Sequence, residues 1–296
     1  MSHSTIFQGA ATALITPTTN GQVDYKALKR LIDWQISETI DALVFCGTTG
    51  EGATLSESEH QAVLEFAVET VAGRVPVIAG TGSNNTEHAV ELTKMACRVG
   101  CDAMLCVTPY YNKTTQRGLV AMYNTIADAS DKPVIVYNVP SRTGVNIEPE
   151  TYVELVKHPM ITAIKEANGN ISKIVETLAL VGDQADVYCG NDDQIVPMLA
   201  CGCKGVISVL SNVVPRQTAE LVRRYFAGDI PGAMELQTKY LPLVQALFCE
   251  ANPIPVKAAM SAMGYCNNCL RLPLVPLEDA HQAMLLDRMR DVGIAV

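Results

Sequence analysis

Short apolar runs alternate with longer amphipathic segments along this chain as far as residue 228. Each run is apolar throughout instead of alternating with polar residues, which is typical of strands that are buried on both faces. The amphipathic segments repeat apolar residues at helical spacing, as Leu28, Leu31, Ile32 and Ile36 do in the first of them. The pattern therefore predicts parallel strands, each followed by a helix.

We expect strands at 9–18, 42–46, 76–79, 103–107, 133–137, 161–168, 187–189 and 205–210. We expect helices at 25–36, 56–72, 86–99, 116–129, 149–156 and 171–181, one that ends near 200, and one at 215–226. Eight such units favour an α/β fold closed as a (β/α)8 TIM barrel over an open doubly wound sheet. Beyond them the sequence predicts only helices, around 234–248, 255–263 and 278–290. We therefore divide the chain into a barrel at 1–228 and a C-terminal helical region at 229–296.

Composition narrows the class of partner. With 48% hydrophobic and 18% charged residues, the chain is typical of a compact protein and not of a disordered one. A net charge of -9 disfavours nucleic acid and anionic membranes as partners, but it allows a small anionic substrate. Met1 to Ser4 has no basic leader pattern, and no apolar run reaches the roughly 18 residues of a spanning helix. We expect a cytoplasmic protein that does not enter the membrane.

The ten cysteines are expected to be reduced thiols, since disulfides are rare in cytoplasm. Cys201 and Cys203, and likewise Cys266 and Cys269, are spaced like metal ligands, but neither pair has a second well-placed Cys or His pair. Most of the other cysteines lie in or beside apolar runs, where a thiol usually acts as a small core residue. We expect no metal centre and no cofactor.

Lys165 stands near the end of one apolar run, Ile161 to Asn168. Because desolvation of an ammonium is costly, a buried lysine tends to lose its proton and become a nucleophilic amine. Such an amine can condense with a carbonyl compound to form a Schiff base. The alternative is a lysine at a strand end that points into solvent.

Polar residues gather after the other predicted strands. In a barrel the chemistry lies at the carboxyl ends of the strands. Thr48 and Thr49 follow the second strand in a loop bounded by glycines, whose N–H groups and hydroxyls suit a carboxylate. Tyr137 ends the fifth strand and can move protons near an amine, and Arg142 follows it. Together with Lys165, these residues predict a Schiff-base site for a keto acid.

Several of these segments resemble the motifs of the class I pyruvate-dependent aldolase family. They are Gly47–Glu51, Thr108–Asn112, Tyr137–Gly144, Ile164–Ala167, Asn252–Lys257 and Arg271–Leu274. The resemblance covers essentially the whole chain. It implies a (β/α)8 barrel with a C-terminal helical region, usually assembled as a homotetramer built from two dimers. It is closest to the branch that condenses pyruvate with L-aspartate 4-semialdehyde in lysine and diaminopimelate biosynthesis.

The resemblance also implies catalytic roles. Lys165 would form the Schiff base with pyruvate. Thr48, Tyr137 and Tyr111 would form a proton relay, with Tyr111 reaching in from a neighbouring subunit. The imine makes the pyruvate methyl group acidic, the resulting enamine attacks the aldehyde, and the amino group of the second substrate then displaces the lysine by cyclising.

Further residues are implied to bind the substrates. Thr49 would hold the pyruvate carboxylate, and Arg142 would meet the carboxylate of the semialdehyde as a planar bidentate donor. Gly190 and Ile207 would line the site through backbone groups. Asn191 replaces an acid that is frequent in the family.

Two alternatives remain open. One is a sister pyruvate aldolase, such as N-acetylneuraminate lyase or a 2-keto-3-deoxy sugar acid aldolase, and Arg142 is the residue that discriminates against it. The other is a catalytically silent barrel that binds or regulates, which the joint presence of Lys165, Tyr137, Tyr111 and Thr48 disfavours.

A possible effector site for L-lysine is implied at the dimer interface of lysine-sensitive members. The matching positions are Gly52, Ala53, Glu57, His60, Asn84, His88 and Tyr110. Sensitive members place an acid where this chain has His88, and that acid pairs with the α-ammonium of the effector. A neutral imidazole supplies no charge, and Glu57 is an ordinary acid for a first helical turn. We therefore expect weak or absent inhibition by lysine.

Overall fold

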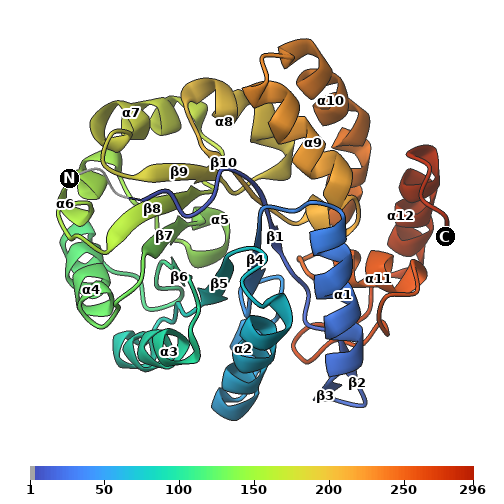
Figure 1. The fold of residues 1–296 in the computed structure, drawn as a ribbon, viewed down its shortest axis with the longest axis horizontal. Helices are drawn as coiled ribbons and strands as arrows, with labels where there is room; N and C mark the ends of the chain where they lie inside the picture. The colour runs from blue at the N-terminus through green and yellow to red at the C-terminus, as the bar shows by residue number, and fades with distance from the viewer. Residues whose placement is uncertain (1–3) are drawn as a thin grey trace.

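The computed structural model describes residues 4–296 and places eight parallel strands in a closed barrel (Figure 1). β1 pairs with both β4 and β10, which closes the sheet, so the predicted TIM barrel is confirmed. The barrel strands are β1 (Gly9–Ala13), β4 (Ala42–Phe45), β5 (Val77–Gly80), β6 (Ala103–Val107), β7 (Val134–Asn138), β8 (Ile161–Glu166), β9 (Asp186–Cys189) and β10 (Gly205–Ser208).

Helices connect successive strands and surround the barrel (Figure 1). Several begin at side-chain caps, such as the capping box that Ser56 and Glu59 form in α2. The connecting α-helices are α1 (Tyr25–Ser37), α2 (Glu57–Val71), α3 (Thr86–Val99), α4 (Gln116–Asp128), α5 (Pro140–Thr143), α6 (Pro149–Leu155), α7 (Ile171–Val181) and α8 (Ile195–Cys201), and α9 (Pro215–Phe226) follows the last strand. The 3-10 turns are η1 (Gly52–Thr54), η2 (Asp192–Gln194) and η3 (Leu210–Asn212).

The apolar core has two layers, one inside the barrel and one between the barrel and the helices. Small residues such as Ala11, Ala42 and Ala103 face the interior, together with a few larger ones such as Tyr188. Successive residues of a strand point to opposite faces. In β8 this alternation places Lys165 on the face that looks into the barrel and Glu166 on the face that looks toward the helices.

The structure differs from the sequence expectations mainly at element ends. The first strand ends at Ala13 and not near 18. Thr18 belongs instead to a separate hairpin of β2 (Thr18–Thr19) and β3 (Gln22–Val23). Strands of two residues are too short to leave a periodic pattern. The helix α5 was also unexpected, since it has only four residues.

Three helices follow the barrel: α10 (Ile230–Leu247), α11 (Ile254–Ala262) and α12 (Asp279–Asp291). α10 packs against α9 and α8, and α12 packs against α10 and α11. Figure 1 shows α11 and α12 beside α1. The division of the chain at 228/229 stays a prediction. Within residues 4–296, no helix combines the length and apolar character needed to cross a membrane.

Candidate active site

Lys165 and Tyr137 form the centre of the candidate site. They are register partners on adjacent strands, and Nζ of Lys165 lies 4.3 Å from the centroid of the Tyr137 ring. Lys165 is only 5% exposed, which confirms that it is buried and excludes the solvent-facing alternative. Its pKa is lowered from 10.5 to about 8, mainly by burial; Asp192 and Cys189 oppose this shift, and the charge of Arg142 contributes to it. At neutral pH the unprotonated amine is therefore far more populated here than on an ordinary lysine.

The hydroxyl of Tyr137 stays protonated at neutral pH. Burial raises the pKa of Tyr137 to about 12, although the nearby Arg142 cation acts in the opposite direction. A protonated hydroxyl can both donate and accept a hydrogen bond. Tyr137 is thus suited to pass a proton and not to hold a charge.

Gly190 lies next to the side chain of Lys165, whereas the role of Ile207 stays a prediction. A Cβ atom on Gly190 would lie 3.2 Å from Cε of Lys165 and 2.7 Å from Cβ of Ala167, so a larger residue would crowd the lysine. Ile207 is fully buried in β10 and belongs to the inner core layer. The space around Lys165 therefore depends on glycine at position 190.

The loop after β4, Gly47–Glu51, holds the two threonines that the sequence singled out. Thr48 is exposed, whereas Thr49 is 3% exposed. The Oγ1 atom of Thr49 accepts a hydrogen bond of 2.9 Å from Nδ2 of Asn252. Thr49 therefore has a fixed side chain, and Asn252 is a site residue to which the sequence analysis gave no role.

Arg142 lies on α5, directly after β7. Its Nη2 atom donates to the backbone oxygen of Asn252 at 3.2 Å. Asn252 thus contacts both predicted substrate-binding residues, Thr49 and Arg142. The Oδ1 atom of Asn252 is buried and has no hydrogen-bond partner within the described chain. In the sequence, Asn252 stood out only as part of the Asn252–Lys257 motif. The position of that motif in the chain does not predict that it lies at the mouth of the barrel.

A second buried network lies behind Lys165, on the outer face of the barrel. Glu166 is fully buried and accepts hydrogen bonds from Tyr152 Oη (2.8 Å), Asn138 Nδ2 (3.0 and 3.2 Å) and the backbone N–H of Asn168 (2.9 Å). Burial raises the pKa of Glu166 to about 7, and the hydrogen bonds from Asn138 and Tyr152 limit that rise. These contacts fix the end of β8. The sequence analysis did not find those from Tyr152 and Asn138, which lie 14 and 28 positions from Glu166.

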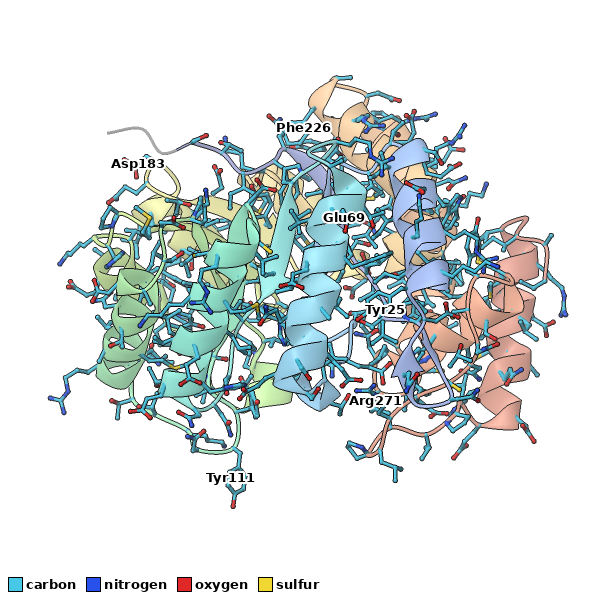
Figure 2. All side chains as sticks on the ribbon, turned by 60° about the horizontal axis from the view of Figure 1, so that its bottom comes forward. Tyr25, Glu69, Tyr111, Asp183, Phe226 and Arg271 are labelled. Atoms are coloured by element: carbon cyan, nitrogen blue, oxygen red, sulfur yellow. The ribbon has the colours of Figure 1, made fainter. Side chains whose placement is uncertain are left out.

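Tyr111 is not brought to Lys165 within the chain. It is 93% exposed and projects away from the body of the molecule (Figure 2). Its φ of 69° lies in the left-handed region, which is unfavourable for a tyrosine. A large aromatic residue held out in this way is available to another subunit but not to its own barrel.

The seven predicted effector positions fall into two contacting pairs and three other residues. Asn84 Nδ2 donates to the backbone oxygen of Tyr110 at 3.2 Å, and His88 Nδ1 lies 3.8 Å from a carboxylate oxygen of Glu57. His60 is buried, and desolvation lowers its pKa to about 4, with a small contribution from the nearby His88. Gly52 and Ala53 lie in η1.

Two groups of side chains could share a cation. They are Glu57, His88 and Glu91 on one surface, and Glu250, Glu278 and His281 in the C-terminal region. The members pair with one another, as His281 Nδ1 does with Glu250 at 2.6 Å. Neither group includes a residue of the Lys165 site.

The barrel and its buried amine define the class of protein: a TIM-barrel enzyme equipped for Schiff-base chemistry on a carbonyl substrate. A model of the "Dihydrodipicolinate synthetase family" matches residues 6–291. The chain therefore belongs to the dihydrodipicolinate synthetase family, and the predicted class of lyase is confirmed.

Relatives extend over almost the whole chain. The 4-hydroxy-tetrahydrodipicolinate synthase of Geobacter metallireducens is 51% identical over 286 residues, which cover 97% of this chain and 99% of the relative. A crystal structure of the chloride-inhibited dihydrodipicolinate synthase from Acinetobacter baumannii complexed with pyruvate is 41% identical, with a TM-score of 0.96 over 98% of this chain and 100% of that one. A structure described as the first monomeric dihydrodipicolinate synthase variant is 42% identical, with a TM-score of 0.96 over 98% of both chains.

Proposed function

We propose that this chain condenses pyruvate with L-aspartate 4-semialdehyde to give 4-hydroxy-tetrahydrodipicolinate, in the biosynthesis of lysine and diaminopimelate. The observation that carries the proposal is the buried Lys165 amine beside Tyr137. A relative with 51% sequence identity bears the name of this synthase, and a similar crystal structure contains pyruvate. They favour condensation over the sister aldolases and over a silent barrel.

The first half of the reaction uses Lys165 and the threonine loop. The free amine of Lys165 attacks the keto carbon of pyruvate, and loss of water gives the imine. Thr49 and the N–H groups of its loop hold the carboxylate. Tyr137 and Thr48 carry protons to and from the reacting oxygen.

The second half uses Arg142. The imine acidifies the pyruvate methyl group, and loss of a proton gives an enamine that attacks the aldehyde carbon of the second substrate. Arg142 binds the carboxylate of that substrate through charge-assisted hydrogen bonds. The amino group of the second substrate then attacks the imine carbon, which closes the ring and releases Lys165.

An assay with two arms tests this proposal. The protein is supplied with pyruvate and aspartate semialdehyde, and product is followed with a coupled reductase. In a parallel arm it is supplied with N-acetylneuraminate. Turnover in the first arm and none in the second is expected. Turnover only in the second arm would contradict the proposal.

We further propose that the active form is a cytoplasmic homotetramer in which Tyr111 completes the proton relay of a neighbouring subunit. The exposed position of Tyr111 supports sharing between subunits, and the ten free cysteines suit a reducing compartment. The fold alone does not decide the assembly, since a similar structure is described as monomeric. Sedimentation velocity tests the tetramer directly.

Feedback by lysine is proposed to be weak. The effector would need a negative partner for its α-ammonium, but Glu57 already lies 3.8 Å from the imidazole of His88. Loss of one charge-assisted contact corresponds to about ten- to a hundredfold in affinity. In a lysine titration, the His88→Glu variant should be inhibited at a lower lysine concentration than the parent. Strong inhibition of the parent at submillimolar lysine would contradict this.

A further inference from the structure

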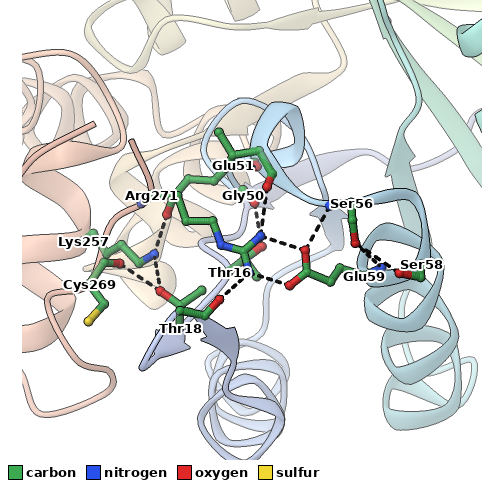
Figure 3. Close-up of polar contacts among 12 residues, drawn as sticks. Thr16, Thr18, Gly50, Glu51, Ser56, Ser58, Glu59, Lys257, Cys269 and Arg271 are labelled. Atoms are coloured by element: carbon green, nitrogen blue, oxygen red, sulfur yellow. Dashed lines mark hydrogen bonds and ion pairs between the residues drawn. The ribbon is translucent and has the colours of Figure 1, made fainter. Parts of the chain in front are cut away.

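Lys257 is a second buried lysine, with a side chain that has no exposed surface. It lies on α11 in the C-terminal region, and its Nζ contacts the carboxylate of Glu51, which is also buried (Figure 3). Oγ1 of Thr18 lies 3.4 Å from the same nitrogen. Buried ion pairs seldom stabilise a fold more than apolar residues of the same volume would, because both charges lose their hydration. The place of this pair in the fold suggests another role.

Glu51 closes the loop that carries Thr48 and Thr49. Its backbone is left-handed, with φ 53° and ψ 33°, and its N–H donates to the oxygen of Thr48 at 3.1 Å. This conformation is unfavourable for a residue with a side chain, so contacts elsewhere must hold it. Both carboxylate oxygens are held from the C-terminal region: one by Lys257, and the other by the backbone N–H of Arg271 at 3.2 Å.

The loop has little room to move independently of Glu51. The hydroxyl of Thr16 donates to the backbone oxygen of Gly50 at 2.7 Å. A Cβ atom on Gly50 would lie 3.1 Å from the backbone nitrogen of Cys46, and one on Gly52 would lie 2.0 Å from the backbone oxygen of Cys46. Because interiors are close-packed, a displaced Glu51 shifts the loop as a unit.

The same C-terminal segment also touches the substrate side of the loop. Asn252, which precedes α11, donates to Thr49 and accepts from Arg142. The segment from Asn252 to Lys257 is thus fastened to the loop at two points, the hydroxyl of Thr49 and the carboxylate of Glu51. Asn252 directly precedes the N-cap of α11 and Lys257 lies in its first turn, so the start of this helix sets the distance between these points.

We propose that Glu51 and Lys257 are positioning residues for the keto-acid carboxylate: their buried contact fixes the loop that places Thr48 and Thr49 beside Lys165. This inference rests on the proposed function, because it concerns how pyruvate is held before the imine forms. Neither residue reacts with the substrate. The C-terminal region therefore forms part of the active site instead of an appendage to it.

The test removes both charges together, in Glu51→Gln/Lys257→Met, because a single change would leave an unpaired buried charge. The melting temperature should stay near that of the parent. The KM for pyruvate should rise, and borohydride trapping of the imine at subsaturating pyruvate should slow, by roughly tenfold or more, since small displacements of site groups can cost up to about a hundredfold. Parental KM and trapping rate in this variant would overturn the proposal.

Glu51→Asp provides a second variant that keeps the charge and shortens the side chain by one carbon. It should also raise the KM for pyruvate, because position and not charge is what matters, and a parental KM would overturn the proposal even if the double variant does not fold. Arg223→Met is the matched control. It removes the partly exposed contact of Arg223 with Asp41 (3.1 Å) at the opposite end of β4. Because such a pair contributes little to stability, both the melting temperature and the KM should stay near those of the parent.

The parent protein separates the two proposals. If the parent forms no trapped imine with pyruvate, the proposed function fails whatever the variants do. If the parent is trapped and the variants behave like it, only the positioning role fails.

Discussion

Lys165 and Tyr137 occupy paired positions on β8 and β7, and the lysine nitrogen lies 4.3 Å from the centre of the tyrosine ring. The quadrupole of the ring favours a cation on the lysine. Burial has the larger effect and lowers the pKa of Lys165 to about 8. The pair therefore combines an amine that can be free near neutral pH with a hydroxyl that can pass protons.

The pKa of Lys165 should determine how the rate of imine formation depends on pH. Only the free amine attacks the keto carbon, and its fraction grows as the pH rises through about 8. The rate should climb about tenfold per unit well below pH 8 and level off above it. Single-turnover mixing with pyruvate, quenched by borohydride, measures this profile. A rate that still climbed tenfold per unit between pH 9 and 10 would indicate an ordinary lysine pKa.

Arg142→Ala should impair use of the semialdehyde more than imine formation with pyruvate. The arginine is exposed and lies on α5, while the amine lies deep in the barrel. Loss of a charge-assisted contact costs about 1.5–3 kcal/mol, so the KM for the semialdehyde should rise about ten- to a hundredfold. Separate titrations of the two substrates decide this, with Arg117→Ala, an exposed arginine of α4, as the matched control. An equal loss of pyruvate trapping would mean that Arg142 only supports the fold.

Mixed assemblies test whether Tyr111 acts across subunits. Tyr111→Phe and Lys165→Ala should each be nearly inactive alone. After subunits exchange, some sites combine an intact Lys165 with an intact Tyr111 from the neighbour, so part of the activity should return. Differently tagged subunits establish that exchange has occurred. Activity that stays absent in purified mixed assemblies would contradict a shared site.

The sequence was sufficient to predict the barrel because its strands are buried on both faces and leave continuous apolar runs. It also singled out Lys165, since a lysine in such a run is unusual. The rule that chemistry lies at strand ends then selected Thr48, Thr49, Tyr137 and Arg142, which lie at or just after the ends of β4 and β7. Their roles stay predictions.

Contacts between distant segments could not be predicted. Asn252 reaches Thr49 across 203 positions, and Lys257 reaches Glu51 across 206. No local pattern links such residues, because their proximity depends on how the C-terminal helices pack. The buried network of Glu166 was missed for the same reason: the acid follows Lys165 directly, and only the strand alternation turns it to the opposite face.

Trapping the covalent intermediate tests the central claim most directly. The protein is incubated with pyruvate, reduced with borohydride, digested and mapped by mass spectrometry. One adduct per chain is expected, on the peptide that contains Lys165. It should be absent from Lys165→Ala, while Glu51→Gln/Lys257→Met should still form it, more slowly. An adduct on any other lysine, or full activity in Lys165→Ala, would contradict the account.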